Sequence, residues 1–293
     1  MLRSAFRVHV PATSANLGPG FDAVGIALSV GLRAEVRRAR RFSLEFAGGH
    51  TPSHDGYECA IKRAIERAGG SLPRVSMNVH NDIPLGKGLG SSAAAAVLGL
   101  AVAQRCAGKR LDRRALAAEA SDLEGHPDNA FAAVYGGTVI AASSSRIFLA
   151  PPRDLRAIVI VPNVDLSTRD ARSLLPHQYS RDDVAFTAAR ASLLGAALAT
   201  GSWRALREAM RDRMHQPYRS KVVPGLAEAL AIQLHGLVGI ALSGAGPSVL
   251  AIVRRTAATR VGERIRDCFV NAGVDAEILN LEFAARGIAV RGA

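Results

Sequence analysis

A short glycine-rich run, residues 84–96, constrains this chain more than any other segment; it reads Pro-Leu-Gly-Lys-Gly-Leu-Gly-Ser-Ser-Ala-Ala-Ala-Ala. Its three glycines carry no Cβ, so the backbone there can curl and approach another group closely. Ser91 and Ser92 then open an alanine-rich helix, whose first N–H groups lack partners inside the helix. Because the positive end of a helix dipole favours an anion, the run predicts a loop that binds phosphate.

Lys87 stands inside this run, before its last two glycines. The Walker pattern of P-loop proteins places the lysine directly after the final glycine, so that pattern is absent here. We therefore expect a phosphate-binding loop of a different kind.

The apolar pattern indicates an α+β fold, because strand-like and helix-like stretches are intermixed without regular alternation. The sequence predicts a helix from Ser91 to Cys106, a helix capped by Asp112, and strands over Thr138–Ala142 and, as the last one, Ala276–Leu281. A chain of 293 residues is long enough for two domains. The Ser/Pro/Arg-rich passage 143–154 is the expected boundary, which gives domains of residues 1–150 and 151–293.

The formal charge of +12 raises the question of a nucleic-acid partner. Arginine supplies almost all of the positive charge. No aromatic residues interleave with the densest cluster, 33–41, to stack on bases. We therefore expect no nucleic-acid partner, with a non-enzymatic RNA-binding protein as the distant alternative.

The chain also shows no sign of a membrane or of export. No uninterrupted apolar run reaches the ~20 residues of a membrane span, and the first residues do not read as a signal peptide. Three widely spaced cysteines, at positions 59, 106 and 268, suit a reduced compartment better than a disulfide framework. A cytoplasmic protein is expected.

A second glycine-containing motif, residues 11–22, joins the first predicted strand to the second. It reads Pro-Ala-Thr-Ser-Ala-Asn-Leu-Gly-Pro-Gly-Phe-Asp. Asn16 and Asp22 either form local turns or present an amide and a carboxylate to a ligand. The residues alone leave both interpretations open.

A third motif, Glu-Gly-His-Pro-Asp-Asn over residues 124–129, lies between two predicted helices. Asp128 or Asn129 can cap the second helix. Alternatively, Glu124 supplies an oxygen ligand for Mg²⁺ and Asp128 faces a substrate as anchor or base, with His126 as a hydrogen-bond donor.

The loop 243–248, Ser-Gly-Ala-Gly-Pro-Ser, connects two predicted strands, as a tight hairpin or as a backbone surface that approaches a ligand. Thr168 and Arg172 are four residues apart, so on a helix they share a face. Arg219 follows a predicted helix. Surface arginines are common in this chain, but a pair of them would hold a small carboxylate well.

Together, motifs 11–22, 84–94 and 242–248 resemble the three signatures of the GHMP kinases, and motif 11–22 with residues 124–129 is most similar to the homoserine kinases among them. The resemblance spans residues 8 to about 282. It implies the GHMP kinase fold, with a ribosomal-S5-domain-2-like N-terminal half and a ferredoxin-like C-terminal half. It also implies a role in threonine biosynthesis and makes a homodimer the expected assembly.

The resemblance further implies ATP as phosphate donor and Mg²⁺ held by Ser91 and Glu124. The residues implied in ATP binding are Pro84, Leu85, Gly86, Lys87, Gly88, Leu89, Gly90, Ser91, Ser92, Ala93 and Ala94.

The implied substrate, L-homoserine, carries an ammonium, a carboxylate and a primary hydroxyl, and each charge needs a partner because desolvating it is costly. Asp22 and Asp128 can balance the ammonium and Arg172 and Arg219 the carboxylate, while Asn16 and Asn129 orient the hydroxyl. The substrate-binding set is completed by His126, Thr168 and Gly244.

The expected chemistry is in-line transfer of the γ-phosphoryl group to the side-chain hydroxyl, with Asp128, Asn129 and Asn16 as the catalytic candidates. The first motif lacks the basic residue that galactokinase-like and mevalonate-kinase-like relatives carry, which weakens an Asp–Lys base mechanism. Whether Asp128 acts as a general base or only anchors the ammonium stays open. Another GHMP kinase, acting on threonine, mevalonate, pantoate or shikimate, is the near alternative.

Overall fold

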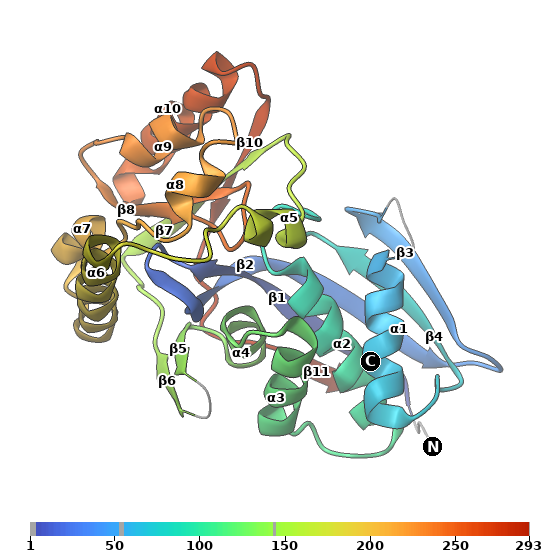
Figure 1. The fold of residues 1–293 in the computed structure, drawn as a ribbon. Helices are drawn as coiled ribbons and strands as arrows, with labels where there is room; N and C mark the ends of the chain where they lie inside the picture. The colour runs from blue at the N-terminus through green and yellow to red at the C-terminus, as the bar shows by residue number, and fades with distance from the viewer. Residues whose placement is uncertain (1–3, 53–55, 143–144, 293) are drawn as a thin grey trace.

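The computed structural model describes residues 4–52, 56–142 and 145–292, and it shows two β-sheets with helices packed on them (Figure 1). The first sheet has the order β11-β1-β2-β4-β3, and β5 and β6 extend it from β2. β3 and β4 are parallel, and the other pairs are antiparallel. Its strands are β1 (Phe6–Asn16), β2 (Gly20–Arg38), β3 (Ser43–Gly49), β4 (Val75–Asn81), β5 (Thr138–Ala142), β6 (Ser145–Leu149) and β11 (Ala289–Gly292).

Side-chain alternation explains why only one face of this sheet carries helices. Along β1 and β2, Val8 and Val36 are buried while Arg7 and Arg37 on the opposite face are exposed. The helices that pack against the sheet and against one another are α1 (Gly56–Gly69), α2 (Ser91–Cys106), α3 (Arg113–Glu124) and α4 (Asp128–Tyr135).

Helix α2 lies in the centre of this layer and is buried along most of its length. Its small residues let it approach α1 closely: a Cβ on Gly99 would come within 2.5 Å of the carbonyl oxygen of Ile61. A helix that is apolar all round is a core helix, so the N-terminal end of α2 is fixed rigidly. The three glycines of run 84–96 lead directly into this end of α2.

The second sheet is antiparallel, with the order β10-β7-β9-β8. Its strands are β7 (Leu155–Pro162), β8 (Leu237–Leu242), β9 (Val249–Arg254) and β10 (Ala276–Leu281). The helices of this half are α5 (Thr168–Ser173), α6 (Arg181–Thr200), α7 (Leu206–Ala209), α8 (Gln216–Arg219), α9 (Leu226–Ala231) and α10 (Ala258–Asn271). One core cluster includes Leu155, Val159 and Leu250 together with residues of the first sheet, so the halves share packed interior.

The α+β prediction is confirmed, as are several local ones. Helix α2 begins at Ser91, strand β5 covers Thr138–Ala142, and Asp112 caps α3 by accepting the N–H of Ala115 at 3.0 Å.

Two elements escaped the sequence analysis. β10 is not the last strand, because β11 follows it and pairs with β1 in the first sheet. The passage 143–154 contains β6, a partner of β5, while residues 143 and 144 lie outside the described part of the chain. Strands of only four or five residues, such as β11 and β6, give a weak signal in sequence. The division at 150/151 stays a prediction.

No helix within the described ranges is both long and apolar enough to cross a membrane.

Candidate active site

A cleft of about 330 Å³ lies where motifs 11–22, 84–94 and 242–248 meet. Most of the residues singled out from the sequence line it, although they come from distant parts of the chain. The members of the predicted set that line the cleft are Asn16, Asp22, Gly86, Gly88, Leu89, Gly90, Ser91, Ser92, Glu124, His126, Asp128, Asn129, Thr168, Arg172, Arg219 and Gly244.

The glycine-rich loop before α2 interlocks with the loop between β8 and β9. Gly88 has φ of 77°, and a Cβ there would collide with the carbonyl oxygen of Ser243. The Oγ of Ser243 donates to the carbonyl oxygen of Gly88 at 2.7 Å and lies 2.8 Å from Oγ of Ser14. The three motifs are therefore tied together by contacts that a side chain on Gly88 would break.

Gly90 is the last residue before α2 and has the left-handed conformation, with φ of 66°. No side chain caps the helix, so the N–H groups of its first turn are left for another acceptor. A Cβ on Gly90 would collide with Oγ1 of Thr13, which in turn donates to Oδ1 of Asn129 at 2.7 Å. The cleft thus contains an open helix N-terminus with the geometry of an anion site.

Residues 11–22 are mostly strand, contrary to the long loop expected from sequence: only residues 17–19 form the turn between β1 and β2. Asn16, Leu17 and Asp22 have positive φ angles of 72°, 47° and 55°. Asn16 is buried; its Nδ2 donates to the carbonyl oxygen of Gly244 at 2.9 Å, and its Oδ1 accepts the N–H of Asp22 at 3.0 Å. Strained backbone of this kind gathers at functional sites.

Asp22 and Arg172 form a two-pronged ion pair at one end of the cleft. The guanidinium donates to both carboxylate oxygens, with Nη2–Oδ1 at 2.7 Å and Nη1–Oδ2 at 3.1 Å. Ser167 caps α5 by accepting the N–H of Asp170 at 3.1 Å. Thr168 and Arg172, one turn apart on this helix, both line the cleft.

Arg219 lies beside this pair but is almost completely buried, with 1% of its surface exposed. Phe21 packs near both arginines: its ring centre is 5.4 Å from Cζ of Arg172 and 5.7 Å from Cζ of Arg219. Burial, and next the charge of Arg172, lower the pKa of Arg219 to about 10. Both guanidiniums remain charged near neutral pH, so two cations lie here beside the carboxylate of Asp22.

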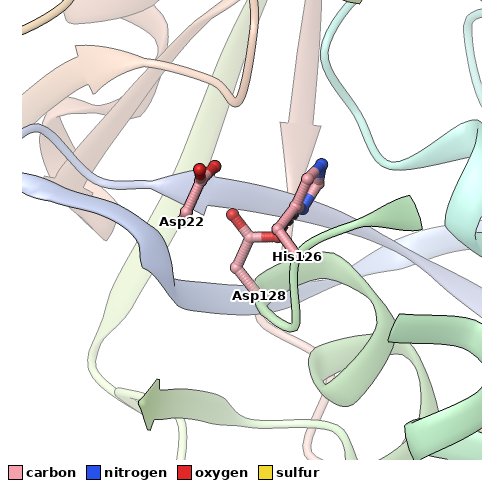
Figure 2. Close-up of side chains that lie close together, drawn as sticks. All are labelled: Asp22, His126 and Asp128. Carbon is pink, nitrogen blue, oxygen red and sulfur yellow. Dashed lines mark hydrogen bonds and ion pairs between the residues drawn. The ribbon is translucent and has the colours of Figure 1, made fainter. Parts of the chain in front are cut away.

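His126 lies on the loop that leads into α4 and Asp128 is the first residue of that helix, both opposite Asp22 on β2 (Figure 2). Nδ1 of His126 is 2.6 Å from Oδ1 of Asp128, and the three side chains place one ligand atom each within 4.8 Å of one another. Burial lowers the pKa of His126, but the hydrogen bond and charge of Asp128 raise it by more, so the net shift is upward. Arg172 pairs with Asp22, and the ring of His126 is hydrogen-bonded to Asp128, so both carboxylates already have partners within the protein.

Asp128 is the first residue of α4, and Pro127, not Asp128 or Asn129, occupies the capping position. Oδ1 of Asp128 accepts the N–H of Asn129 at 2.6 Å. Among the described residues, no group donates to its other oxygen, Oδ2. That oxygen is left for a ligand.

Glu124, at the end of α3, contacts the start of α2. Its Oε1 accepts the hydroxyl proton of Ser92 at 2.7 Å, while Ser91, the serine expected to share a metal with it, also lines the cleft. Burial raises the pKa of Glu124 above its ordinary value, although the Ser92 hydrogen bond opposes this. A partly buried carboxylate in contact with one serine hydroxyl, with a second serine lining the same cleft, is a donor set that suits Mg²⁺.

Five members of the predicted ATP-binding set do not line this cleft. Ala93 and Ala94 are buried in α2, so only their backbone can serve a ligand. Pro84, Leu85 and Lys87 line a separate depression, and Nζ of Lys87 donates to the carbonyl oxygen of Val164 at 2.7 Å and lies 3.2 Å from Oδ1 of Asp165.

Sequence reasoning missed three residues that contact the predicted ones: Thr13 contacts Asn129, and Phe21 and His215 contact Arg219. Thr13 and Phe21 lie within a motif singled out for other residues, and His215 stands four residues before Arg219. The i, i+4 spacing of His215 and Arg219 is the one signal that could have found the last contact.

Comparison with known proteins agrees with this geometry. The family model described as "GHMP kinases N terminal domain" matches residues 57–137, and "GHMP kinases C terminal" matches residues 194–271. Homoserine kinase of Solibacter usitatus is 41% identical over 97% of this chain and 96% of its own length. Homoserine kinase of Desulfitobacterium hafniense is 38% identical over 97% of this chain and 99% of its own.

The fold is shared with solved structures as well. The crystal structure of homoserine kinase from Cytophaga hutchinsonii superposes with a TM-score of 0.83 at 26% identity, over 99% of this chain and 98% of that one. Family models, full-length relatives and structure agree, and the chain belongs to the homoserine kinase family of the GHMP kinases.

Proposed function

We propose that this protein transfers the γ-phosphoryl group of MgATP to the side-chain hydroxyl of L-homoserine, giving O-phospho-L-homoserine for threonine biosynthesis. One observation carries the proposal: a single cleft has an open helix N-terminus at α2 and side chains of both charges beside it. The first feature suits phosphate and the second suits a zwitterionic amino acid.

At the nucleotide end, the backbone of residues 86–92 and the uncapped first turn of α2 would hold the phosphates. Backbone N–H groups fixed before the reaction stabilise charge without reorganising. Mg²⁺ fits beside them, because Ser91, Ser92 and Glu124 offer oxygen ligands there. When bound, the ion neutralises charge on the transferred phosphoryl group.

At the amino-acid end, Arg172 and Arg219 would take the carboxylate, and Asp22 and Asp128 the ammonium. Asp22 already holds Arg172, so binding of a zwitterion exchanges part of one ion pair for two. Thr168 and Gly244 line the same region and would complete the contacts.

Asn129, next to Asp128, would orient the hydroxyl toward the phosphate; its Oδ1 is held by Thr13 at 2.7 Å and its Nδ2 is 3.3 Å from Oδ1 of Asp128. Asn16 would act through Gly244, because both polar atoms of its amide are engaged. Asp128 would serve as anchor, since phosphoryl transfer depends mainly on positioning and charge neutralisation.

The proposal is tested with purified protein, MgATP and a panel of L-homoserine, L-threonine, mevalonate, pantoate and shikimate. Formation of ADP is followed by a coupled assay. We expect kcat/KM for L-homoserine to exceed that for every other alcohol by at least about 100-fold. Mevalonate, pantoate and shikimate lack the ammonium that Asp22 and Asp128 would pair with, and L-threonine carries a secondary hydroxyl one carbon nearer the charged groups. A higher kcat/KM for another alcohol would reassign the substrate within the family.

We further propose a homodimer. Leu193 on α6 is 37% exposed, and residues 191–200 around it carry no charge although the chain has a net charge of +12. A second copy can approach this face without repulsion. Light scattering should give twice the chain mass for the native protein and for Val270→Asp on α10, but one chain mass for Leu193→Asp. Monomeric native protein would refute the dimer.

A division into residues 1–150 and 151–293 is supported by the two sheets, with β11 returning to the first. The unpaired Cys59, Cys106 and Cys268 support a reducing, cytoplasmic compartment.

A further inference from the structure

His215 has no exposed surface and lies between the turn of motif 11–22 and Arg219. Its Nε2 is 2.8 Å from the carbonyl oxygen of Gly18, and its Nδ1 is 3.1 Å from Nη1 of Arg219. A carbonyl oxygen only accepts and a guanidinium only donates, so Nε2 carries the proton and Nδ1 is the acceptor. His215 is therefore a neutral imidazole with both ring nitrogens engaged.

Asp212 holds the backbone from which His215 projects. Its side chain is also fully buried. Oδ1 accepts the N–H of Met214 at 2.9 Å, and Oδ2 accepts the N–H groups of His215 and Gln216 at 2.8 Å each. The carboxylate thus fixes the start of α8, one turn before Arg219.

The guanidinium of Arg219 is bonded only to neutral acceptors. Nε donates to the carbonyl oxygen of Ala171 at 3.2 Å, and Nη1 donates to the carbonyl oxygen of Gly244 at 3.0 Å and to Nδ1 of His215. Among the described residues, no carboxylate lies within 4.0 Å of its nitrogens. A buried cation without a counter-ion in the protein is oriented for an anion in the cleft that it lines.

We infer that His215, held by Asp212, is a positioning residue for Arg219, and that it aims the guanidinium at the carboxylate of the substrate. The inference rests on the proposed function. A protonated imidazole would repel Arg219, and an apolar side chain would leave Nη1 one acceptor short, so only a neutral acceptor at the position of Nδ1 serves. The hydrogen bond to Gly18 connects the same ring to motif 11–22.

Two variants separate the two bonds of the ring. His215→Asn places an amide oxygen near the position of Nδ1, which keeps the acceptor for Arg219 and loses the donor to Gly18. His215→Gln places its amide nitrogen near Nε2, which keeps the donor and loses the acceptor. We expect His215→Gln to raise KM for L-homoserine about 10- to 100-fold with KM for MgATP unchanged, and His215→Asn to raise it much less.

A carboxylate-free substrate distinguishes positioning from a general structural role. 3-Aminopropan-1-ol keeps the hydroxyl and ammonium of homoserine at the same spacing but lacks the carboxylate. Measured as substrate, or as competitive inhibitor where turnover is too slow, it should bind native protein and His215→Gln within about twofold of each other.

The inference would be overturned if His215→Gln lost as much affinity for 3-aminopropan-1-ol as for homoserine. It would also be overturned if KM for L-homoserine rose equally in the two variants. Circular dichroism and KM for MgATP show whether each variant is folded, and either folded variant alone gives a result. Failure of the proposed function is a different outcome: native protein would then not phosphorylate L-homoserine at all.

Discussion

Arg172 and Asp22, 150 positions apart in sequence, are joined by two hydrogen bonds of 2.7 and 3.1 Å at the amino-acid end of the cleft. The pair connects α5 of the second half to β2 of the first. Because it is partly exposed, its own contribution to stability is small. Its importance lies in placing opposite charges where a zwitterion would bind.

Replacing Arg172 with alanine should therefore weaken homoserine binding and leave nucleotide binding intact. The expected rise in KM for L-homoserine is about 10- to 100-fold, the worth of a charge-assisted contact, with KM for MgATP within about twofold. Steady-state kinetics in both substrates measures this, with Arg169→Ala on the same helix as control. Equal weakening of both substrates would contradict a role confined to the carboxylate.

Asp128→Asn should separate anchor from base. The neutral amide keeps the shape of the side chain but loses the charge that pairs with an ammonium. We expect KM for L-homoserine to rise about tenfold or more, while kcat stays within about threefold, because little base catalysis is needed. A large fall in kcat at unchanged KM would instead identify Asp128 as the base.

Glu124→Gln should raise the Mg²⁺ concentration needed for half-maximal rate by about tenfold or more, because it removes the carboxylate that contacts Ser92 at the start of α2. Asp122→Asn, an exposed acid two residues earlier on α3, is the matched control and should leave the Mg²⁺ requirement unchanged. If the control shifts the requirement and Glu124→Gln does not, the ligand assignment is wrong.

Gly86 and Gly88, two of the three glycines of the loop, should tolerate alanine very differently. Both have positive φ, 68° at Gly86 and 77° at Gly88, which costs an L-residue about 1–2 kcal/mol. A Cβ at Gly86 meets open space, but at Gly88 it collides with Ser243, so Gly88→Ala must also push two motifs apart. We expect Gly88→Ala to unfold at lower denaturant and to lose most activity, and Gly86→Ala to be affected less. The reverse order would refute the interlocking of the loops.

The buried imidazole of His215 should make the fold sensitive to acid. Burial is the main cause that lowers its pKa below 6.5, with Arg219 acting in the same direction and Asp212 against it. The unfolded chain takes up a proton near 6.5 that the folded chain does not, so this stabilisation is present above pH 6.5 and is lost below it. The loss approaches about 1.4 kcal/mol per pH unit for one proton.

Denaturant unfolding between about pH 7.5 and 5.5 measures that loss in native protein and in His215→Asn, which cannot titrate. The variant should show the shallower decline with acid. Identical slopes would mean that His215 titrates alike in both states.

The sequence was sufficient to predict the parts of this site that depend on backbone chemistry. Glycines at 86, 88 and 90 indicated a curled loop, and the serines after them indicated a helix start, because these signals are local. Asn16, Asp128 and Arg219, which the family resemblance singled out, line the cleft, and their roles there stay predictions.

Contacts made through tertiary packing were beyond the sequence. Lys87 stands inside the loop, yet its side chain bonds to Val164, and no local pattern specifies that direction. β11 pairs with β1 from the other end of the chain. The link from Asp212 through His215 to Arg219 depends on burial of all three side chains, which a single sequence does not report.

The central claim is tested most directly by ³¹P NMR of native protein incubated with MgATP and L-homoserine. The account expects the γ-phosphate resonance to be replaced by a phosphomonoester resonance with the proton coupling of a CH₂–O–P group, in equal amount to ADP. Release of inorganic phosphate alone, or ATP consumption at the same rate without L-homoserine, would contradict transfer to the amino-acid alcohol.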